Sequence, residues 1–222
     1  MNPSTQISAI AGAAGAIDVA LDLPRGPLAG VAVIAHPHPL YGGTRDNKVV
    51  QTLARALLQS DYACWRPNFR GVGASEGGHD EGRGETVDLL AVVDAALAHP
   101  SAAGTASIPV VLAGFSFGAF VQSRVALALA QQGRPARGVV LVAPAVSRFE
   151  VAALGVRALI VHGELDDVVP LASVLDWARP QDLPVVVVPG ADHFFHRRLP
   201  LLKRIVGEWM RAGGDDAGAA AR

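Results

Sequence analysis

The chain has 222 residues, 50% of them hydrophobic, and a formal net charge of −1. This length allows one domain with a sizeable core, and the balanced charge gives no reason to expect a nucleic-acid or anionic membrane partner. Cys64 is the only cysteine, which excludes an intrachain disulfide. It lies in an apolar run, where we expect a buried and unreactive thiol.

The sequence contains no recognisable targeting or membrane segment. The mildly apolar stretch Ile7–Ile17 lacks the basic residues that open a secretory signal, and Asp18 follows it closely. No run is long and apolar enough to span a membrane. We therefore predict a cytoplasmic protein with a single domain over residues 1–222, in which residues 213–222 form a frayed tail.

Hydrophobic periodicity predicts an alternation of strands and helices along the chain. The predicted strands are Ile17–Leu23, Val31–Ala35, Tyr62–Phe69, Ile108–Ala113, Gly138–Ala143, Ala158–His162 and Val185–Val188. The predicted helices are Asn47–Ser60, Glu85–His99, Ala119–Gln132, a short turn over Phe149–Leu154, Leu171–Ala178 and Pro200–Met210.

This alternation indicates an α/β fold with a mainly parallel sheet and helices on both faces. In Ile17–Leu23, aspartates alternate with apolar residues, which predicts a half-exposed antiparallel strand at the sheet edge. Functional sites of such sheets lie at the carboxyl ends of the strands. Candidate residues follow five of the predicted strands: His36 and His38, Arg70, Ser116, Asp166 and His193.

The pentapeptide Gly114-Phe115-Ser116-Phe117-Gly118 has the form G-x-S-x-G and lies between a predicted strand and a predicted helix. In that context the serine occupies a sharp turn that exposes its hydroxyl, and small residues on either side leave room for the turn. A serine needs a base to accept its proton and a carboxylate to orient that base. The motif therefore predicts a nucleophile with partners elsewhere in the chain.

The order Ser116, Asp166, His193 along the chain is that of a catalytic triad. Together with the tract His36-Pro37-His38-Pro39-Leu40-Tyr41-Gly42-Gly43, the sequence resembles the α/β-hydrolase superfamily over nearly its whole length, and that tract is similar to a bacterial group of small hydrolases. The resemblance implies the α/β-hydrolase fold and a serine-hydrolase mechanism, and no metal or cofactor is predicted.

Each predicted partner has a rival nearby. His196, beside two arginines, is the rival of the predicted base His193. The superfamily pattern G-x-x-D-x-x-V-P aligns its aspartate with Asp166, and Asp167 is the rival acid.

Two backbone N–H groups are needed to stabilise the oxyanion. The resemblance implies one from Phe117, the residue after the nucleophile. The other is expected after Val31–Ala35, where two prolines have no N–H to donate. This leaves His38, which we favour, and Leu40 as the alternative.

The connection after Gly138–Ala143 has roughly the length of an ordinary loop, so no cap domain is expected. An open, shallow site favours small or short-acyl substrates. The candidate apolar walls are Leu40, Tyr41, Phe115, Phe117, Phe194 and Phe195.

The leading hypothesis is a serine carboxylesterase that hydrolyses a small-molecule ester. A thioesterase or a peptidase with the same triad remains open. A metallohydrolase would have to use His36, His38, Asp192 and His196, whose spacing matches no familiar metal site. A non-catalytic binding protein with the same fold is the remaining alternative.

Overall fold

The computed structural model describes residues 5–102 and 108–219, with side chains described up to residue 213 in the last helix. Eight strands form one sheet in the order β1-β2-β4-β3-β5-β6-β7-β8. β1 pairs antiparallel with β2 and β2 with β4, and all the other pairs are parallel. The strands are β1 Gln6–Gly12, β2 Gly15–Asp22, β3 Gly30–Ala35, β4 Tyr62–Pro67, β5 Val110–Phe115, β6 Gly138–Val142, β7 Ala158–Gly163 and β8 Val185–Val188.

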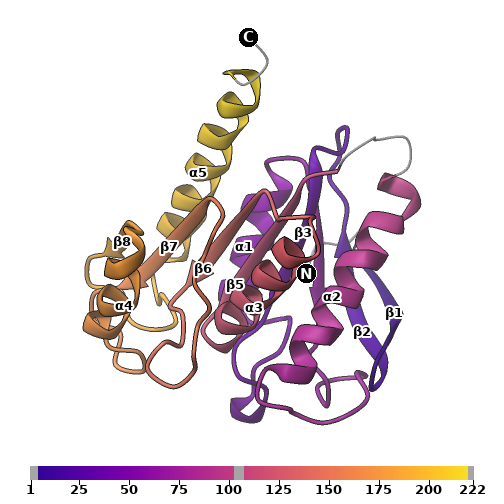
Figure 1. The fold of residues 1–222 in the computed structure, drawn as a ribbon, viewed down its shortest axis with the longest axis horizontal. Helices are drawn as coiled ribbons and strands as arrows, with labels where there is room; N and C mark the ends of the chain where they lie inside the picture. Colours follow the sequence, from indigo (N-terminus) through magenta and orange to yellow (C-terminus); the bar gives the residue numbers. More distant parts are fainter. Residues whose placement is uncertain (1–4, 103–107, 220–222) are drawn as a thin grey trace.

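Helices cover both faces of the sheet (Figure 1). The α-helices are α1 Lys48–Leu58, α2 Arg83–Ala98, α3 Phe117–Gln131, α4 Leu171–Ala178 and α5 Leu199–Ala219, and the short 3₁₀ helices are η1 Pro39–Tyr41, η2 Pro100–Ala102 and η3 Arg179–Gln181. Helices α1 and α5 pack together on one face, while α2 and α3 pack together on the other. The mainly parallel α/β fold is therefore confirmed.

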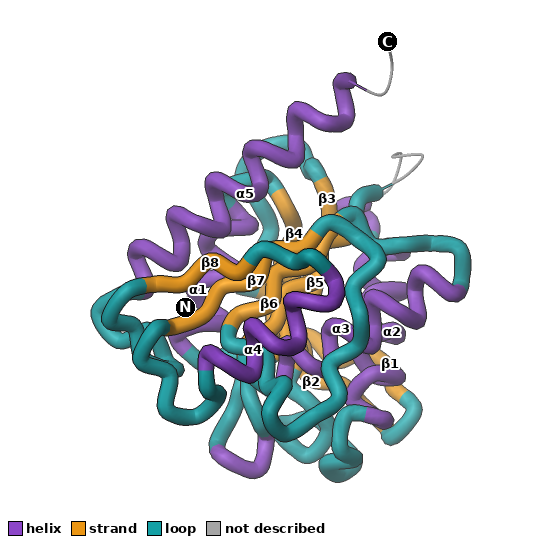
Figure 2. Tube along the Cα trace, turned by 60° about the vertical axis from the view of Figure 1, so that its left-hand side comes forward, coloured by secondary structure: helices purple, strands orange, loops and turns teal. Residues whose placement is uncertain are grey.

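The two-sided burial of β3 explains why its sequence is apolar without interruption. Val31 and Val33 belong to the core under α2 and α3, and Ala32 and Ile34 belong to the core under α1 and α5. Successive side chains of a strand point to opposite faces, so a central strand needs apolar residues at every position. The loops that follow the parallel strands gather at one edge of the sheet (Figure 2).

The prediction of a half-exposed edge strand over Ile17–Leu23 was wrong. β1 forms the edge, and β2 lies between β1 and β4 with Asp18 and Asp22 both buried. Arg66 donates to the Asp22 carboxylate at 2.8 Å, and Arg45 forms an ion pair with Asp18. The alternating aspartates thus face arginines instead of water, and β1, which is largely exposed, was not predicted as a strand.

Two further segments differ from their predictions. Phe149–Leu154, predicted as a short turn of helix, forms no helix. Side chains bond this backbone instead: Ser123 Oγ accepts from the Ala152 N–H, and Trp177 Nε1 donates to the Val151 carbonyl. α5 continues to Ala219, through most of the predicted tail, and residues 220–222 lie outside the described part.

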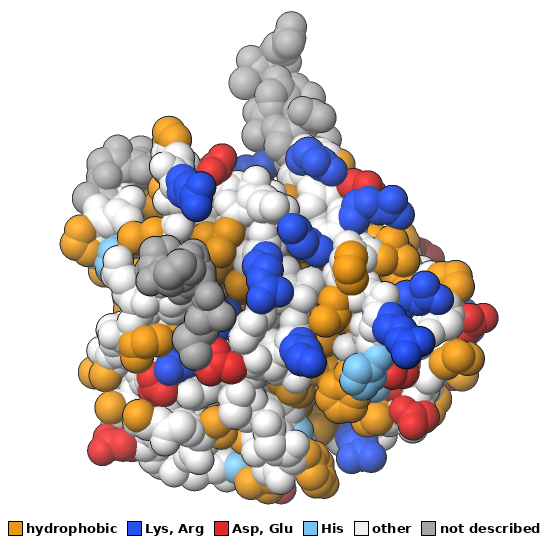
Figure 3. Space-filling model, turned by 180° about the vertical axis from the view of Figure 1, so that it is seen from behind, with side chains coloured by type: hydrophobic (Ala, Val, Ile, Leu, Met, Phe, Trp, Pro, Cys, Tyr) orange, Lys and Arg blue, Asp and Glu red, His pale blue; other side chains and the backbone are white. Residues whose placement is uncertain are grey.

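The face covered by α1 and α5 carries several Lys and Arg side chains (Figure 3), including Lys203 and Arg204.

Candidate active site

Ser116 lies at the turn between β5 and α3, at the carboxyl end of the central strands. Its φ of 57° and ψ of −117° are unusual for a residue with a side chain, and such strain is typical of a nucleophile held on a sharp turn. The flanking glycines are needed for close approach. A Cβ on Gly114 would lie 2.4 Å from the Gly118 carbonyl oxygen, and a Cβ on Gly118 would lie 2.4 Å from the Ala35 oxygen.

The structure brings Ser116, His193 and Asp166 together in one hydrogen-bonded chain. His193 Nε2 lies 3.1 Å from Ser116 Oγ, and His193 Nδ1 lies 2.7 Å from Asp166 Oδ2. All three residues are buried, with 8% of Ser116, 3% of His193 and 8% of Asp166 exposed. These distances are within reach for proton transfer between serine and imidazole.

The Asp166 carboxylate is fixed on both of its oxygens. Oδ1 accepts from the backbone N–H groups of Val168 at 2.9 Å and Val169 at 2.8 Å, which leaves Oδ2 for His193. Burial alone would raise the pKa of Asp166, but the hydrogen bonds from His193 and Val169 outweigh it and hold the pKa below its usual value. The group is therefore an ionised carboxylate near neutral pH.

The two rivals lie outside this chain of hydrogen bonds. His196 Nδ1 pairs with Asp192 Oδ2 at 2.6 Å, and 70% of the His196 side chain is exposed. Asp167 is exposed, and neither of its carboxylate oxygens binds a histidine of the described chain. The geometry thus selects His193 and Asp166 from their neighbours.

Sequence reasoning missed His162, a fully buried residue of β7 beside the carboxylate. Its Nε2 lies 2.9 Å from the Val169 carbonyl oxygen and 3.5 Å from Asp166 Oδ2. Burial lowers the pKa of His162 despite the nearby carboxylate, so the neutral ring donates its Nε2–H here. His162 was interpreted only as the end of a strand, and no local motif distinguishes it.

The loop after β3 is anchored by His36. Its Nε2 accepts from the Phe69 N–H at 2.9 Å, so the proton is on Nδ1, which donates to the Pro37 carbonyl at 2.6 Å. Burial lowers the pKa of His36 to about 4. The neutral ring therefore holds the loop against the segment that follows β4.

The two predicted donors of this loop, the N–H groups of His38 and Leu40, differ in their hydrogen bonds. The Leu40 N–H donates to His38 Nδ1 at 3.3 Å within η1. The backbone N–H groups of His38 and Phe117, in contrast, have no acceptor among the described residues. The N–H of Phe117 opens α3, where the first N–H groups of a helix have no intrahelical partner.

A cavity of about 530 Å³ opens above the serine. Its walls are Pro37, His38, Tyr41, Gly42, Gly43, Asn47, Ser116, Arg148, Val168, His193 and Phe194. Tyr41 and Phe194, two of the predicted walls, are exposed here at 76% and 45%. Asn47 and Arg148 also line the cavity and were not predicted.

The prediction that Phe115 and Phe195 line the pocket was wrong. Both are fully buried in the core under α1 and α5. Phe115 is the last residue of β5 and points to the same face as Val111 and Ala113, where its ring supports that of His193 at 4.9 Å. Leu40 is 69% exposed and does not line the cavity either, and the predicted wall Phe117 is buried under α2 and α3.

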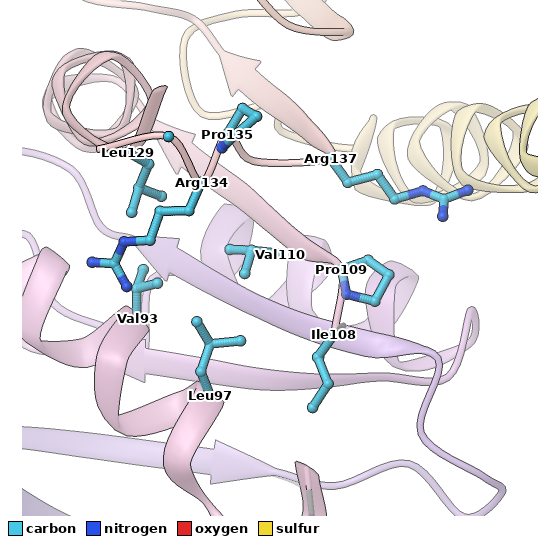
Figure 4. Close-up of a pocket in the computed structure, with 10 residues that line it drawn as sticks. Val93, Leu97, Ile108, Pro109, Val110, Leu129, Arg134, Pro135 and Arg137 are labelled. Carbon is cyan, nitrogen blue, oxygen red and sulfur yellow. The ribbon is translucent and has the colours of Figure 1, made fainter. Parts of the chain in front are cut away.

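A second cavity of about 560 Å³ lies at the opposite end of β5 (Figure 4). Val93 and Leu97 of α2 and Leu129 of α3 form its apolar walls, while Arg137 points toward α5. Its described walls contain no nucleophile or general base. Across residues 5–102 and 108–219, no group of three or more His, Cys, Asp or Glu side chains is placed to hold a metal ion.

Comparison with known proteins agrees with this geometry. A family model described as "Serine aminopeptidase, S33" matches residues 30–151, more than half of the chain. A solved α/β serine hydrolase without lid from Xanthomonas campestris is 33% identical, with a TM-score of 0.84 and 96% of each chain covered. The chain belongs to the α/β-hydrolase superfamily. Like that relative, this hydrolase has no lid: only residues 143–157 connect β6 to β7.

Two further relatives resemble this hydrolase along most of its length. An α/β serine hydrolase homologue from Coxiella burnetii is 38% identical, with a TM-score of 0.81, and the match covers 91% of this chain and 96% of that one. An uncharacterized protein of Rickettsia prowazekii is 29% identical over 83% of this chain and 79% of its own. In the part of the hydrolase that the structure describes, no helix is long and apolar enough to cross a membrane.

Proposed function

We propose that this hydrolase is a carboxylesterase that acts on small or short-acyl esters through an acyl-enzyme intermediate. The observation that carries the proposal is the continuous hydrogen-bonded chain from Ser116 Oγ through His193 to Asp166. The small, lidless cavity supports a short substrate, because it offers no covered channel for a long acyl chain.

In the first half of the reaction, Ser116 Oγ attacks the ester carbonyl while its proton passes to His193 Nε2. The negative charge that develops on the carbonyl oxygen is stabilised by the N–H groups of Phe117 and His38. Asp166 stabilises the imidazolium and holds its Nδ1 proton. When the intermediate collapses, the C–O bond to the alcohol breaks and His193 returns its proton to the leaving oxygen.

In the second half, His193 removes a proton from water, whose oxygen attacks the acyl-serine. The bond to Ser116 Oγ then breaks, and the serine recovers its proton from His193. The products are an alcohol and an acid, and the enzyme is regenerated. The same steps act on a thioester, so both substrate types belong in the first assays.

The experiment that tests this proposal is intact-protein mass measurement after incubation with a fluorophosphonate, followed by turnover of short-chain esters. One adduct on the parent protein, absent in Ser116→Ala, is expected, as is turnover that the variant loses. His193→Asn and His196→Asn form a matched pair, because only the first removes a group from the hydrogen-bonded chain. A folded parent protein without any adduct would instead support the alternative hypothesis of a non-catalytic binding protein.

A further inference from the structure

Arg148 is an exposed arginine in the wall of the catalytic cavity. It lies in the connection between β6 and β7, and its backbone N–H donates to the Ala145 carbonyl at 3.2 Å. The adjacent Phe149 anchors the loop by stacking on Phe120 of α3, with ring centroids 4.8 Å apart. The loop therefore has a fixed position that holds a positive charge at the cavity.

No carboxylate of the described chain neutralises this charge. Arg45, Arg66 and Arg70 each pair with a buried aspartate, whereas Arg148 has no such partner among the described residues. The cavity walls contain no Asp or Glu side chain. A guanidinium that faces an open cavity without a counter-ion is available to an anionic ligand.

The neighbouring polar walls supply further donors. Asn47 caps α1 by accepting the Val49 N–H on Oδ1 at 2.8 Å, which leaves its NH₂ group as the remaining polar function. The exposed Tyr41 adds a hydroxyl group. The described walls of the cavity thus combine one cation with neutral donors.

We propose that the cavity binds esters that carry a carboxylate, with Arg148 as the residue that selects the charge. The inference rests on the proposed esterase function and names its substrate class. A carboxylate matches the planar fork of one guanidinium with a single negative charge. A phosphate monoester carries nearly two negative charges at neutral pH, and the single positive charge of Arg148 does not balance them.

The test compares esters that differ only by charge. One pair carries the charge on the alcohol side: para-acetoxybenzoate and para-acetoxybenzamide. The other carries it on the acyl side: monoethyl glutarate and its terminal amide. The measured quantity is the ratio of kcat/KM for the carboxylate to that for the amide within each pair, so that an effect on the triad or on folding cancels.

The parent protein is expected to prefer at least one carboxylate about tenfold, the lower end for a charge-assisted hydrogen bond at a partly solvated site. The ratio falls to about one in Arg148→Met and reverses in Arg148→Glu, because removing the cation ends the attraction and an anion repels the carboxylate. Arg25→Met is the matched control. Arg25 is an exposed arginine in the turn before β3, at the end of the strand remote from the cavity, and its loss leaves the ratio at the parent value.

The outcomes separate this inference from the proposed function. If both amides are turned over and the ratio of kcat/KM is near one in both pairs, the carboxylate preference is overturned and the esterase proposal is retained. If no ester is turned over, the esterase proposal fails, and binding of the same pairs to Ser116→Ala by calorimetry decides the inference. A preference for the carboxylate that disappears when Arg148→Met is added supports it, and equal or undetectable binding overturns it.

Discussion

Acid should destabilise this hydrolase through His36. The ring is fully buried, and its pKa is lowered from 6.5 to about 4, first by burial and then by the charge of Arg45, against the hydrogen bond to Pro37. The unfolded chain therefore binds a proton near pH 6.5 that the folded chain refuses until near pH 4. Between these values the unfolded state holds more protons, so the free energy of unfolding falls as the pH falls.

The magnitude follows from the two pKa values. A difference of roughly 2.5 units corresponds to about 3 kcal/mol when both states are fully titrated, and to about 2 kcal/mol between pH 7 and pH 5. Burial also lowers the pKa of His162, so that residue contributes in the same direction. The pKa values of Asp18 and Asp166 are lowered too, from the usual 3.8. The stability that these two carboxylates contribute is therefore lost mainly below that pH, outside the interval between pH 7 and pH 5.

The assay is urea unfolding, followed by circular dichroism, of the parent protein and His36→Gln at both pH values. The glutamine offers an oxygen to the Phe69 N–H but does not titrate, so the loss of stability on acidification should be smaller by about 2 kcal/mol. His99→Gln, which removes a histidine far from the site, should lose as much as the parent. Equal losses in the parent and in His36→Gln would refute the neutral buried ring and the tautomer deduced from it.

Three other substitutions or reactions test the site and core. Asp166→Asn should lower kcat by about 10⁴-fold, because the wrong tautomer of His193 is then held, while Asp167→Asn should keep the parental turnover of the test ester. Gly118→Ala places a Cβ 2.4 Å from a carbonyl oxygen of β3 and should abolish fluorophosphonate labelling. In the control Gly207→Ala the added Cβ has no neighbour within 4 Å, so this variant should label fully and should not have a lower melting temperature. Cys64 is fully buried, which raises the pKa of its thiol, so a thiol reagent should modify it only after unfolding, and rapid reaction of the native protein would contradict the packing.

The parallel part of the fold was predictable because each of its strands is a short apolar run between helical patterns. The antiparallel pairing at the N-terminal edge was predicted as well, but the outer strand β1 and the burial of β2 were not. β1 is mostly exposed and has no continuous apolar face, and the burial of Asp18 and Asp22 depends on arginines more than twenty residues away. Sequence periodicity reports the polarity of a side chain, but it does not report whether a distant partner shields it.

The site shows the same division. The turn at Ser116 follows from local sequence, since only small residues fit around it. The error at Phe115 came from the predicted end of its strand, which was placed at Ala113. Because β5 continues to Phe115, the alternation of side chains turns this ring into the core. Arg148 was missed for a different reason. It lies on an irregular loop whose path depends on the packing of Phe149 against α3, and local sequence does not predict that path.

The histidines around the site show why residue type alone does not assign a role. His36 binds only backbone groups through both nitrogens, and His162 donates its Nε2–H to the Val169 carbonyl beside the Asp166 carboxylate. His38 accepts a backbone N–H on Nδ1. Only His193 joins a carboxylate on one nitrogen to a serine hydroxyl on the other. A general base needs this pair of contacts, because one ring nitrogen must keep its proton on the carboxylate while the other accepts the proton of the serine. In the other three rings, the hydrogen bonds hold the scaffold around His193.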